Sequence, residues 1–373
     1  MGLAQSASKA ILAGQADLPE PEPLCGVQMS LQNVQVRVMH LTGQPLQTIK
    51  PFRSFTLEYT IMEDKILGIH HITAIAGEAQ RNYDFYTKVL GLRLVKKTVN
   101  FDDPGTYHFY YGNENGTPGT ILTFFPWTHV KPGRVGTGMA TDIGYAVPKG
   151  SLDFWSKHFE KYQVRFGQID EQFGEQILRF EDPDGLRIQL IEPKVEDTRT
   201  PWETSEIKKD TALKGFHSIV LTLRNIKPTA SILTDIFGYK LLQQDGNRYR
   251  FVTDTVENAA IVDLVEEPEV AHGLVAGGTN HHVAFRVKND EILMHFRDKI
   301  ASAGYNITPK IDRNYFFSLY FREPGGVLFE LATDNPGFAV DEDANTLGTS
   351  LKLPHQYEAE RETIEKVLPK LIQ

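Results

Sequence analysis

The chain has 373 residues, of which 41% are hydrophobic and 23% charged, and this ordinary balance excludes a fibrous or fully disordered protein. Its formal net charge of −9 argues against nucleic acid or an anionic membrane as the main partner, and no run of about 18 apolar residues is present to form a transmembrane helix. The single cysteine, Cys25, excludes a disulfide framework and a cysteine-based metal cage.

The first 61 residues differ in pattern from the rest of the chain. Short apolar pieces alternate there with prolines, at Pro19, Pro21, Pro23, Pro45 and Pro51. A secretory signal would need a basic start and an apolar stretch of about 7–15 residues, and the sequence has neither. We therefore expect a cytoplasmic protein in which residues 1–61 form a flexible extension that carries no chemistry.

From residue 66 onward, one pattern is repeated four times, over residues 66–126, 139–193, 214–266 and 280–334. Each unit opens with a strand-like run, and most continue into an amphipathic helical pattern, with apolar residues at i, i+1, i+4 and i+5. Further strands follow, most clearly around the Pro-x-Gly turns at Pro183 and Pro324. A βαβββ unit of this size cannot bury its apolar face alone, so the units must pair.

The predicted fold class is α+β, with four βαβββ modules paired into two open, barrel-like curved-sheet domains. After the fourth unit, residues 335–373 are expected to form a C-terminal tail. The apolar periodicity near residues 356–371 predicts an amphipathic helix that packs on the outside of the sheets.

Metal ligands for a cavity inside such a sheet would come from the first and last strands of the units. Aligning the first strands places four residues at one position, His71, Asp142, His217 and His282. Six residues after the turn proline, the last strands of units 1, 2 and 4 hold Phe124, Gln189 and Glu330, and Asp263 is the nearest acidic residue in unit 3. Only the fourth unit therefore offers both a histidine and a carboxylate.

One more histidine beside His282 and Glu330 gives a two-histidine, one-carboxylate set, which suits Fe(II) and leaves positions open for substrate and dioxygen. That histidine is His217 if neighbouring units pair, and His71 if the first unit pairs with the fourth. An isomerase of the glyoxalase type would need a fourth protein ligand, and Phe124 occupies the corresponding place in unit 1. The ligand count favours an oxygenase, and no second metal is expected between units 2 and 3.

Two of the candidate ligands belong to histidine pairs, His70–His71 and His281–His282. Since neighbours on a strand point to opposite faces, we expect His70 and His281 to point away from the metal or to reach the cavity only at the start of the strand. The other histidines have no partner in the sequence and are expected on the surface or in the core: His40, His108, His129, His158, His272, His295 and His355.

Several of these motifs resemble those of a known family. The chain contains His-His-Ile-Thr at residues 70–73, Pro-Gly-Gly-x-x-x-Glu at residues 324–330, and related segments at residues 148–152, 215–218 and 341–343. Together with the repeated unit, they resemble the vicinal oxygen chelate superfamily. Within it, the chain is similar to the dioxygenases that cleave the ring of para-hydroquinones, over about residues 66–351.

This resemblance implies a metal-bearing barrel made of the first and fourth units, with Fe(II) held by His71, His282 and Glu330, and a second, non-catalytic barrel made of units 2 and 3. It also implies that His70, Thr73 and His281 surround the metal ligands. By register back from Glu330, it assigns function to two further residues, Arg313 and Tyr320. Tyr320 would relay or donate a proton, and Arg313 would stabilise negative charge on the ring.

The implied substrates are dioxygen and an aromatic para-diol, which is hydroquinone or a halogenated relative. The aromatic ring would be opened between a hydroxylated carbon and its neighbour. Three alternatives stay open on the sequence alone. They are a catechol extradiol dioxygenase, a metal-dependent isomerase or lyase of the glyoxalase type, and a non-enzymatic protein that sequesters a ligand in the same fold. The sequence leaves the oligomeric state open.

Overall fold

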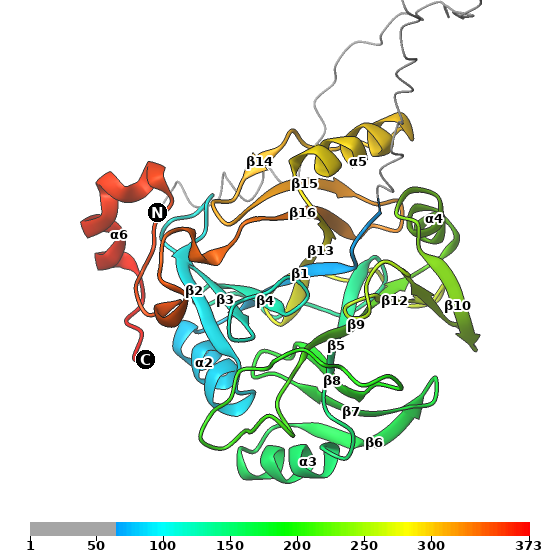
Figure 1. Cartoon of the computed structure of the whole chain (residues 1–373), viewed down its shortest axis with the longest axis horizontal. Helices are drawn as coiled ribbons and strands as arrows, with labels where there is room; N and C mark the ends of the chain where they lie inside the picture. Colours follow the sequence, from blue (N-terminus) through cyan, green and yellow to red (C-terminus); the bar gives the residue numbers. More distant parts are fainter. Residues whose placement is uncertain (1–64) are drawn as a thin grey trace, which may run out of the picture. The chain divides into compact units, whose positions relative to one another are not determined.

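The computed structural model describes residues 65–373, and the expected extension over residues 1–61 lies outside these described residues. The prediction of four βαβββ units that pair into two curved sheets is confirmed (Figure 1). No helix within residues 65–373 is both long and apolar enough to cross a membrane.

The four units follow one another with the same order of elements. Unit 1 consists of β1 (Ile69–Ala76), α2 (Ala79–Asp84), η1 (Phe85–Val89), β2 (Arg93–Val99), β3 (Tyr107–Gly112) and β4 (Ile121–Pro126). Unit 2 consists of β5 (Met139–Ala146), α3 (Leu152–Lys161), β6 (Phe166–Gln172), β7 (Glu175–Glu181) and β8 (Arg187–Glu192). Unit 3 consists of β9 (Gly215–Leu223), α4 (Lys227–Ser231), η2 (Ile232–Ile236), β10 (Lys240–Asp245), β11 (Arg248–Val252) and β12 (Ile261–Glu266). Unit 4 consists of β13 (Thr279–Val287), α5 (Asp290–Ser302), β14 (Ile311–Asp312), β15 (Phe316–Arg322) and β16 (Leu328–Pro336).

Each sheet has eight strands and combines two units. Sheet A joins units 1 and 4 in the order β14-β15-β16-β13-β1-β4-β3-β2, and sheet B joins units 2 and 3 in the order β10-β11-β12-β9-β5-β8-β7-β6. At the centre of each sheet the two first strands pair antiparallel, and each is flanked by the parallel last strand of its own unit. The two halves of a sheet are thus related by an approximate twofold axis that runs between the first strands.

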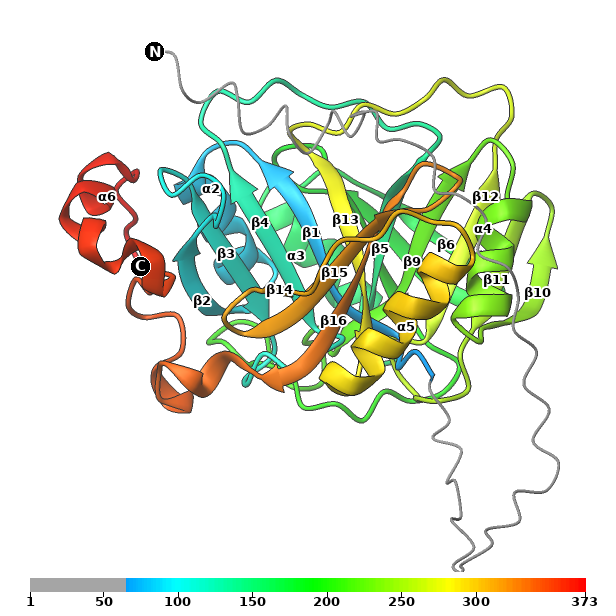
Figure 2. The ribbon, with the colours of Figure 1, turned by 90° about the horizontal axis from the view of Figure 1, so that it is seen from above.

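The helices lie outside the curved sheets. Helix α5 packs against β15 and β16 of sheet A, and α3 packs against β6 and β7 of sheet B (Figures 1 and 2). Aromatic rings fill the core beneath them. Phe237, from the helical segment of unit 3, packs against Phe285 and Phe329 of unit 4, so neighbouring units share a core even though their strands belong to different sheets.

The helices of units 1 and 3 are shorter as α-helices than their apolar spacing predicts. Each ends in a π-helical turn, η1 and η2, in which the backbone N–H of Leu90 donates to the Phe85 carbonyl and that of Phe237 donates to the Ile232 carbonyl, both at 3.0 Å. A π turn is wider than an α turn. The wider turn lets apolar residues spaced by four and five positions remain buried together.

The C-terminal tail contains four short helical segments, and the first two are the 3-10 turns η3 (Phe338–Val340) and η4 (Ala344–Thr346). A 3-10 segment, η5 (His355–Glu360), leads into α6 (Arg361–Val367), so the α-helix is shorter than the predicted 356–371. It ends there because Leu368 precedes Pro369, and a residue before proline is disfavoured in the helical region. Ile364 and Leu368 are buried, as expected of an amphipathic helix on the surface of a sheet.

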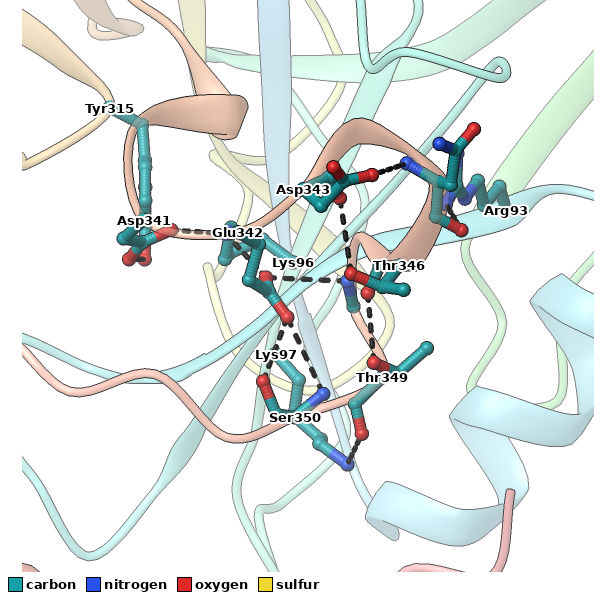
Figure 3. Close-up of polar contacts among 12 residues, drawn as sticks. Arg93, Lys96, Lys97, Tyr315, Asp341, Glu342, Asp343, Thr346, Thr349 and Ser350 are labelled. Atoms are coloured by element: carbon teal, nitrogen blue, oxygen red, sulfur yellow. Dashed lines mark hydrogen bonds and ion pairs between the residues drawn. The ribbon is translucent and has the colours of Figure 1, made fainter.

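A polar cluster fastens the tail to sheet A (Figure 3). The Nζ atom of Lys96, on β2, lies 2.6 Å from Oδ1 of Asp341 and 2.5 Å from Oε2 of Glu342. The Lys96 side chain is fully buried, and the Tyr315 hydroxyl donates to Oδ2 of Asp341 at 3.0 Å. Burial would raise the pKa of Glu342, but Lys96 holds it below its usual range. The tail is therefore tied both to β2 and to the segment that leads into β15.

Candidate metal centre

Three side chains on the central strands of sheet A converge. Oε2 of Glu330, on β16, lies 3.2 Å from Nε2 of His71 on β1 and 2.9 Å from Nε2 of His282 on β13. All three residues are buried, and their ligand atoms lie within 4.8 Å of one another. Within residues 65–373 this is the one cluster of histidine, cysteine and acidic side chains close enough to hold a metal ion.

The paired histidines do not point away from each other, which differs from the expectation based on strand alternation. In the β1–β13 ladder, Ile69 pairs with Phe285 and His71 with Ala284, so His70 is an extra residue. The same ladder leaves His281 as an extra residue on β13. Such β-bulges interrupt the alternation and turn a side chain toward its neighbour.

As a result, each candidate ligand is hydrogen-bonded to the histidine before it. Nδ1 of His70 lies 2.9 Å from Nδ1 of His71, and Nδ1 of His281 lies 2.8 Å from Nδ1 of His282. Burial lowers the pKa of His70 well below its ordinary value and, with the nearby His282, lowers the pKa of His281 to about 3. Both outer histidines therefore stay neutral, and each can accept a hydrogen bond from the Nδ1–H of the inner ring, which leaves each inner Nε2 with a lone pair directed at Glu330.

The environment of Glu330 fits a bound cation. Its Oε1 accepts a hydrogen bond from the Ser318 hydroxyl, while Oε2 is buried and has no hydrogen-bond donor of good geometry. Burial would raise the pKa of Glu330, but the positive charge that His71 and His282 carry when protonated holds it well below its usual range. Two imidazole lone pairs and a carboxylate oxygen thus face one another in a dry site. A buried cluster of this kind is stable when it coordinates a metal.

Arg313 and Tyr320 lie together beside the cluster. The Tyr320 ring contacts the His282 ring edge-on at a centroid distance of 5.7 Å, and Nε of Arg313 donates to the Tyr320 hydroxyl at 3.3 Å. Burial and the Glu330 carboxylate raise the pKa of Tyr320, so it keeps its proton at neutral pH. Burial alone would lower the pKa of Arg313, but Tyr320 raises it, and the guanidinium stays charged.

The fourth ligand position belongs to a residue other than Phe124. In the parallel ladders Ala284 pairs with Glu330 and Thr73 pairs with Thr123, so Thr123 is the twofold equivalent of Glu330. Phe124 faces the opposite side, where its ring packs 4.5 Å from that of Tyr86. The expectation that Phe124 occupies this place was therefore wrong by one residue. The reason is the turn, because β4 begins three residues after Pro118 whereas β16 begins four residues after Pro324.

The alignment of unit 3 was also displaced by one residue. In the β5–β9 ladder Ser218 pairs with Gly144 and Phe216 with Tyr145, so His217 is the bulged residue and corresponds to His70. Ser218 holds the position that His71 holds in unit 1. His217 lies in sheet B, where its Nε2 is 3.2 Å from Oε1 of Glu175. Of the two histidines considered for the third ligand, only His71 is near Glu330.

Several residues of the site were missed by sequence reasoning. Ser318 supports Glu330, and the Phe316 ring packs 4.9 Å from that of His71. His108, expected to be an unpartnered core or surface residue, is hydrogen-bonded to both Thr123 and Tyr110. No local sequence motif marks these residues. They could have been found from the alternation of side chains along β3 and β15. These strands pair with the last strands β4 and β16, and every second residue on them points to the same face.

Comparison with known proteins places the chain among enzymes. The model of the glyoxalase/bleomycin resistance protein/dioxygenase superfamily matches residues 68–190 and 215–331. A Bacillus subtilis (strain 168) protein named as a ring-cleaving dioxygenase, MhqO, is 48% identical over 82% of this chain and 97% of its own length. A chlorohydroquinone/hydroquinone 1,2-dioxygenase from Sphingobium indicum is 34% identical over 82% of this chain and 97% of its own length.

A solved structure agrees with the sequence relatives. The crystal structure of a protein described as a dioxygenase from Bacillus subtilis is 46% identical and has a TM-score of 0.80, covering 83% of this chain and 98% of that chain. The likeness therefore extends over the four units and both sheets. The chain belongs to the glyoxalase/bleomycin resistance protein/dioxygenase superfamily and is an oxidoreductase of its ring-cleaving dioxygenase family.

Proposed function

We propose that this chain is an Fe(II)-dependent dioxygenase that opens the ring of hydroquinone-like para-diols, including halogenated ones. The observation that carries the proposal is the convergence of His71, His282 and Glu330 in a dry site, with no fourth histidine or acidic ligand among residues 65–373. A two-histidine, one-carboxylate set suits Fe(II) and leaves coordination positions free for substrate and dioxygen. The similarity to a chlorohydroquinone/hydroquinone dioxygenase supports the substrate class.

Each residue of the site has a role in this proposal. His71, His282 and Glu330 would hold the metal, and His70 and His281 would fix the orientation of the two ligand rings. Bound Fe(II) supplies the redox chemistry that allows dioxygen to react with an aromatic ring. Units 2 and 3 form a non-catalytic domain in this proposal.

The remaining residues act on the substrate. Tyr320, whose pKa is raised by burial and by Glu330, donates a proton to an oxygen atom of the substrate. Arg313 stays charged and stabilises negative charge that develops on the ring. Thr73, on the same face of β1 as His71, donates a hydrogen bond to a substrate oxygen.

The test is oxygen uptake by protein loaded with Fe(II) under anaerobic conditions. Hydroquinone, chlorohydroquinone and catechol are compared at equal concentration, with Glu330→Gln as the matched protein control. Stoichiometric oxygen uptake with the two para-diols, and at least about tenfold less with catechol, is the expected result. Faster uptake with catechol would overturn the substrate assignment. Isomerisation of a glutathione hemithioacetal without oxygen uptake would overturn the proposed chemistry.

A further inference from the structure

A buried line of hydrogen bonds leads from β3 into the metal centre. The Tyr110 hydroxyl lies 2.9 Å from Nδ1 of His108, and Nε2 of His108 lies 3.0 Å from the Thr123 hydroxyl. That hydroxyl in turn lies 2.8 Å from the hydroxyl of Thr73. All four side chains are at least nine-tenths buried. The line ends on the residue of β1 that pairs with His282 across the sheet.

The line is the twofold counterpart of the groups that support Glu330. Tyr110 pairs with Thr123 on neighbouring strands, as Tyr320 pairs with Glu330. Two residues before each tyrosine, His108 bonds to Thr123 and Ser318 bonds to Glu330. Unit 4 uses this arrangement to hold a carboxylate. Unit 1 places a hydroxyl at the same position and adds a histidine behind it.

The direction of the hydrogen bonds follows from the chemistry of the groups. Burial and the nearby His71 lower the pKa of His108 well below its ordinary value, so the ring is neutral and has one donor and one acceptor nitrogen. A buried phenol donates, because burial raises the pKa of Tyr110 and the hydroxyl keeps its proton. Tyr110 then donates to Nδ1 of His108, and Nε2–H donates to Thr123. Thr123 in turn donates to Thr73, whose own proton remains unused by the line.

We propose that Tyr110, His108 and Thr123 are positioning residues that make the Thr73 hydroxyl a donor to a substrate oxygen at the metal centre. The inference rests on the proposed function and deepens it. Thr73 is the residue that touches the substrate, and the other three act through it. A phenolate oxygen is the acceptor that gains most from such a fixed donor, because hydrogen bonds to charged groups are the stronger ones.

The first test reports the hydrogen-bond direction without any turnover. Protein labelled with ¹⁵N-histidine and loaded with Zn²⁺, which is diamagnetic, is examined by NMR, and the His108 signals are assigned by their loss in His108→Gln. The neutral tautomer with the proton on Nε2 is expected between pH 6 and 8. The tautomer with the proton on Nδ1, or a charged ring in that range, would overturn the proposal.

The second test separates positioning from structure by kinetics with Fe(II)-loaded protein and hydroquinone. Thr123→Val is expected to lower kcat about tenfold with little change in KM and in metal content, the size of one hydrogen bond to a charged group. Thr123→Ser keeps the hydroxyl and is expected to restore most of the turnover. The matched control is Tyr111→Phe, since Tyr111 is the neighbour of Tyr110 on β3 but bonds to Asn82 on the helical side.

A double variant decides whether Thr123 acts through Thr73. In the Thr73→Val background, Thr123→Val is expected to cause no further loss, because residues that act as one unit are not additive. A full tenfold loss in that background, or wild-type turnover by Thr123→Val alone, would overturn the proposal. If the wild-type enzyme consumes no oxygen with any para-diol tested, the proposed function and the role of Thr73 are both overturned. The NMR result would still report the direction of the hydrogen bonds.

Discussion

Sheets A and B share one strand order but differ in the residues at four equivalent central positions. The ladders place His71, His282, Thr123 and Glu330 at these positions in sheet A, and Ser218, Asp142, Asp263 and Gln189 in sheet B. Both sheets therefore contain acidic side chains at the centre. Only sheet A combines one with two imidazoles.

The strand that pairs with the last strand of each unit determines whether a carboxylate at the centre of the sheet is free to bind a metal. Opposite Glu330 and Thr123, sheet A has Tyr320 and Tyr110. At the same positions, sheet B has two arginines. One of them, Arg250, lies 2.8 Å from Oδ1 of Asp263. An arginine carries its charge at every accessible pH, so it satisfies a buried carboxylate permanently, whereas a tyrosine leaves the carboxylate free.

The buried network around Arg250 completes the contrast. Nη1 of Arg250 also lies 2.6 Å from Oε2 of Glu175, whose Oε1 is 3.2 Å from Nε2 of His217. Burial would raise the pKa of Glu175, but His217 and Arg250 lower it to about 2. Sheet B thus closes its centre with fixed ion pairs, and sheet A leaves ligand atoms for a metal ion. A shared topology sets the positions, and the charge of the neighbouring strand determines which centre can bind.

The largest expected effect comes from removing a ligand of sheet A. His71→Ala should weaken metal affinity by more than about 100-fold, because outer partners of metal ligands alone account for about 10–100-fold, and turnover should fall to background. Metal per chain after dialysis, measured by plasma mass spectrometry, checks this. Ser218→Ala at the equivalent position of sheet B serves as the control and should keep one metal per chain. Metal retained in His71→Ala but lost in His217→Ala would reverse the assignment of the sheets.

The next effect concerns stability and should be confined to sheet B. Arg250→Met removes the guanidinium that joins the buried Asp263 and Glu175. Asp263 then keeps only Arg248, at 3.5 Å, and Glu175 keeps only His217, so the free energy of unfolding should fall by about 3–5 kcal/mol. Arg179, at the twin position, is more than one-third exposed and pairs with the exposed Asp170, so Arg179→Met should change it by less than about 1 kcal/mol. Urea unfolding followed by circular dichroism measures both. Equal destabilisation by the two variants would show that the buried network is not what holds sheet B.

The third effect sharpens the difference between the tyrosines of sheet A and those elsewhere. Tyr320→Phe should keep metal and fold but lower kcat by about 100-fold or more, the usual size of a general acid contribution. Arg313→Lys should restore little to an Arg313→Ala enzyme, since an ammonium lacks the planar donors of arginine. Tyr145→Phe in sheet B, which removes a buried hydroxyl without a hydrogen-bond partner in the described chain, is the control. Wild-type turnover by Tyr320→Phe would make this residue structural.

The smallest effect compares equivalent turns of units 2 and 4. Burial, together with the Asp184 carboxylate, raises the pKa of Asp182 to about 6, although this side chain accepts hydrogen bonds from Leu186 and Tyr86. The native state therefore holds a proton that the unfolded state has already lost above about pH 4, so stability falls as pH rises from about 4 through 6. This group should account for roughly 2 kcal/mol of that fall.

Asp182→Asn should remove this pH dependence, because an amide does not titrate in this range. The turn should be kept, since the amide oxygen can still accept a hydrogen bond from the backbone N–H of Leu186. Glu323 accepts a hydrogen bond from the backbone N–H of Val327 in the equivalent turn of unit 4, and burial raises its pKa as well. Glu323→Gln should therefore remove a pH dependence of stability that has the same sign. Urea midpoints between pH 4 and 7 measure both. A midpoint that rises with pH in wild-type protein, and becomes flat in Asp182→Asn, would contradict the direction given for this carboxyl.

The features of the fold that repeat in the sequence could be predicted from it. The four units, their order of elements and the place of His282 with Glu330 in one unit depend on motifs with fixed spacing and clear turn residues. The choice of His71 over His217 came from the family resemblance. The same reasoning placed Phe124 and His217 one residue away from the equivalent positions. A bulge or a shorter turn changes the facing of every following side chain, and neither leaves a signal in the pattern of apolar residues.

Cross-strand partners were the other features that sequence reasoning did not reach. Ser318 and His108 meet their partners on a neighbouring strand, and the register of that pairing is set by the ladder rather than by local sequence. The same applies to Lys96, an apparent surface residue that the tail buries beside Asp341. The central ligands could be named because they sit on the strands that define the repeat. Their supports lie on the strands around them, where no motif marks the position.

The contrast between the sheets is tested most directly by locating the metal. Crystals of Fe(II)-loaded protein grown without oxygen, with diffraction recorded above and below the iron absorption edge, show where iron binds. One anomalous peak per chain between Nε2 of His71, Nε2 of His282 and the Glu330 carboxylate, about 2.0–2.2 Å from each as for similar divalent ions, is the predicted result. A peak beside Asp263 and Gln189 in sheet B, or none in sheet A, would contradict the account.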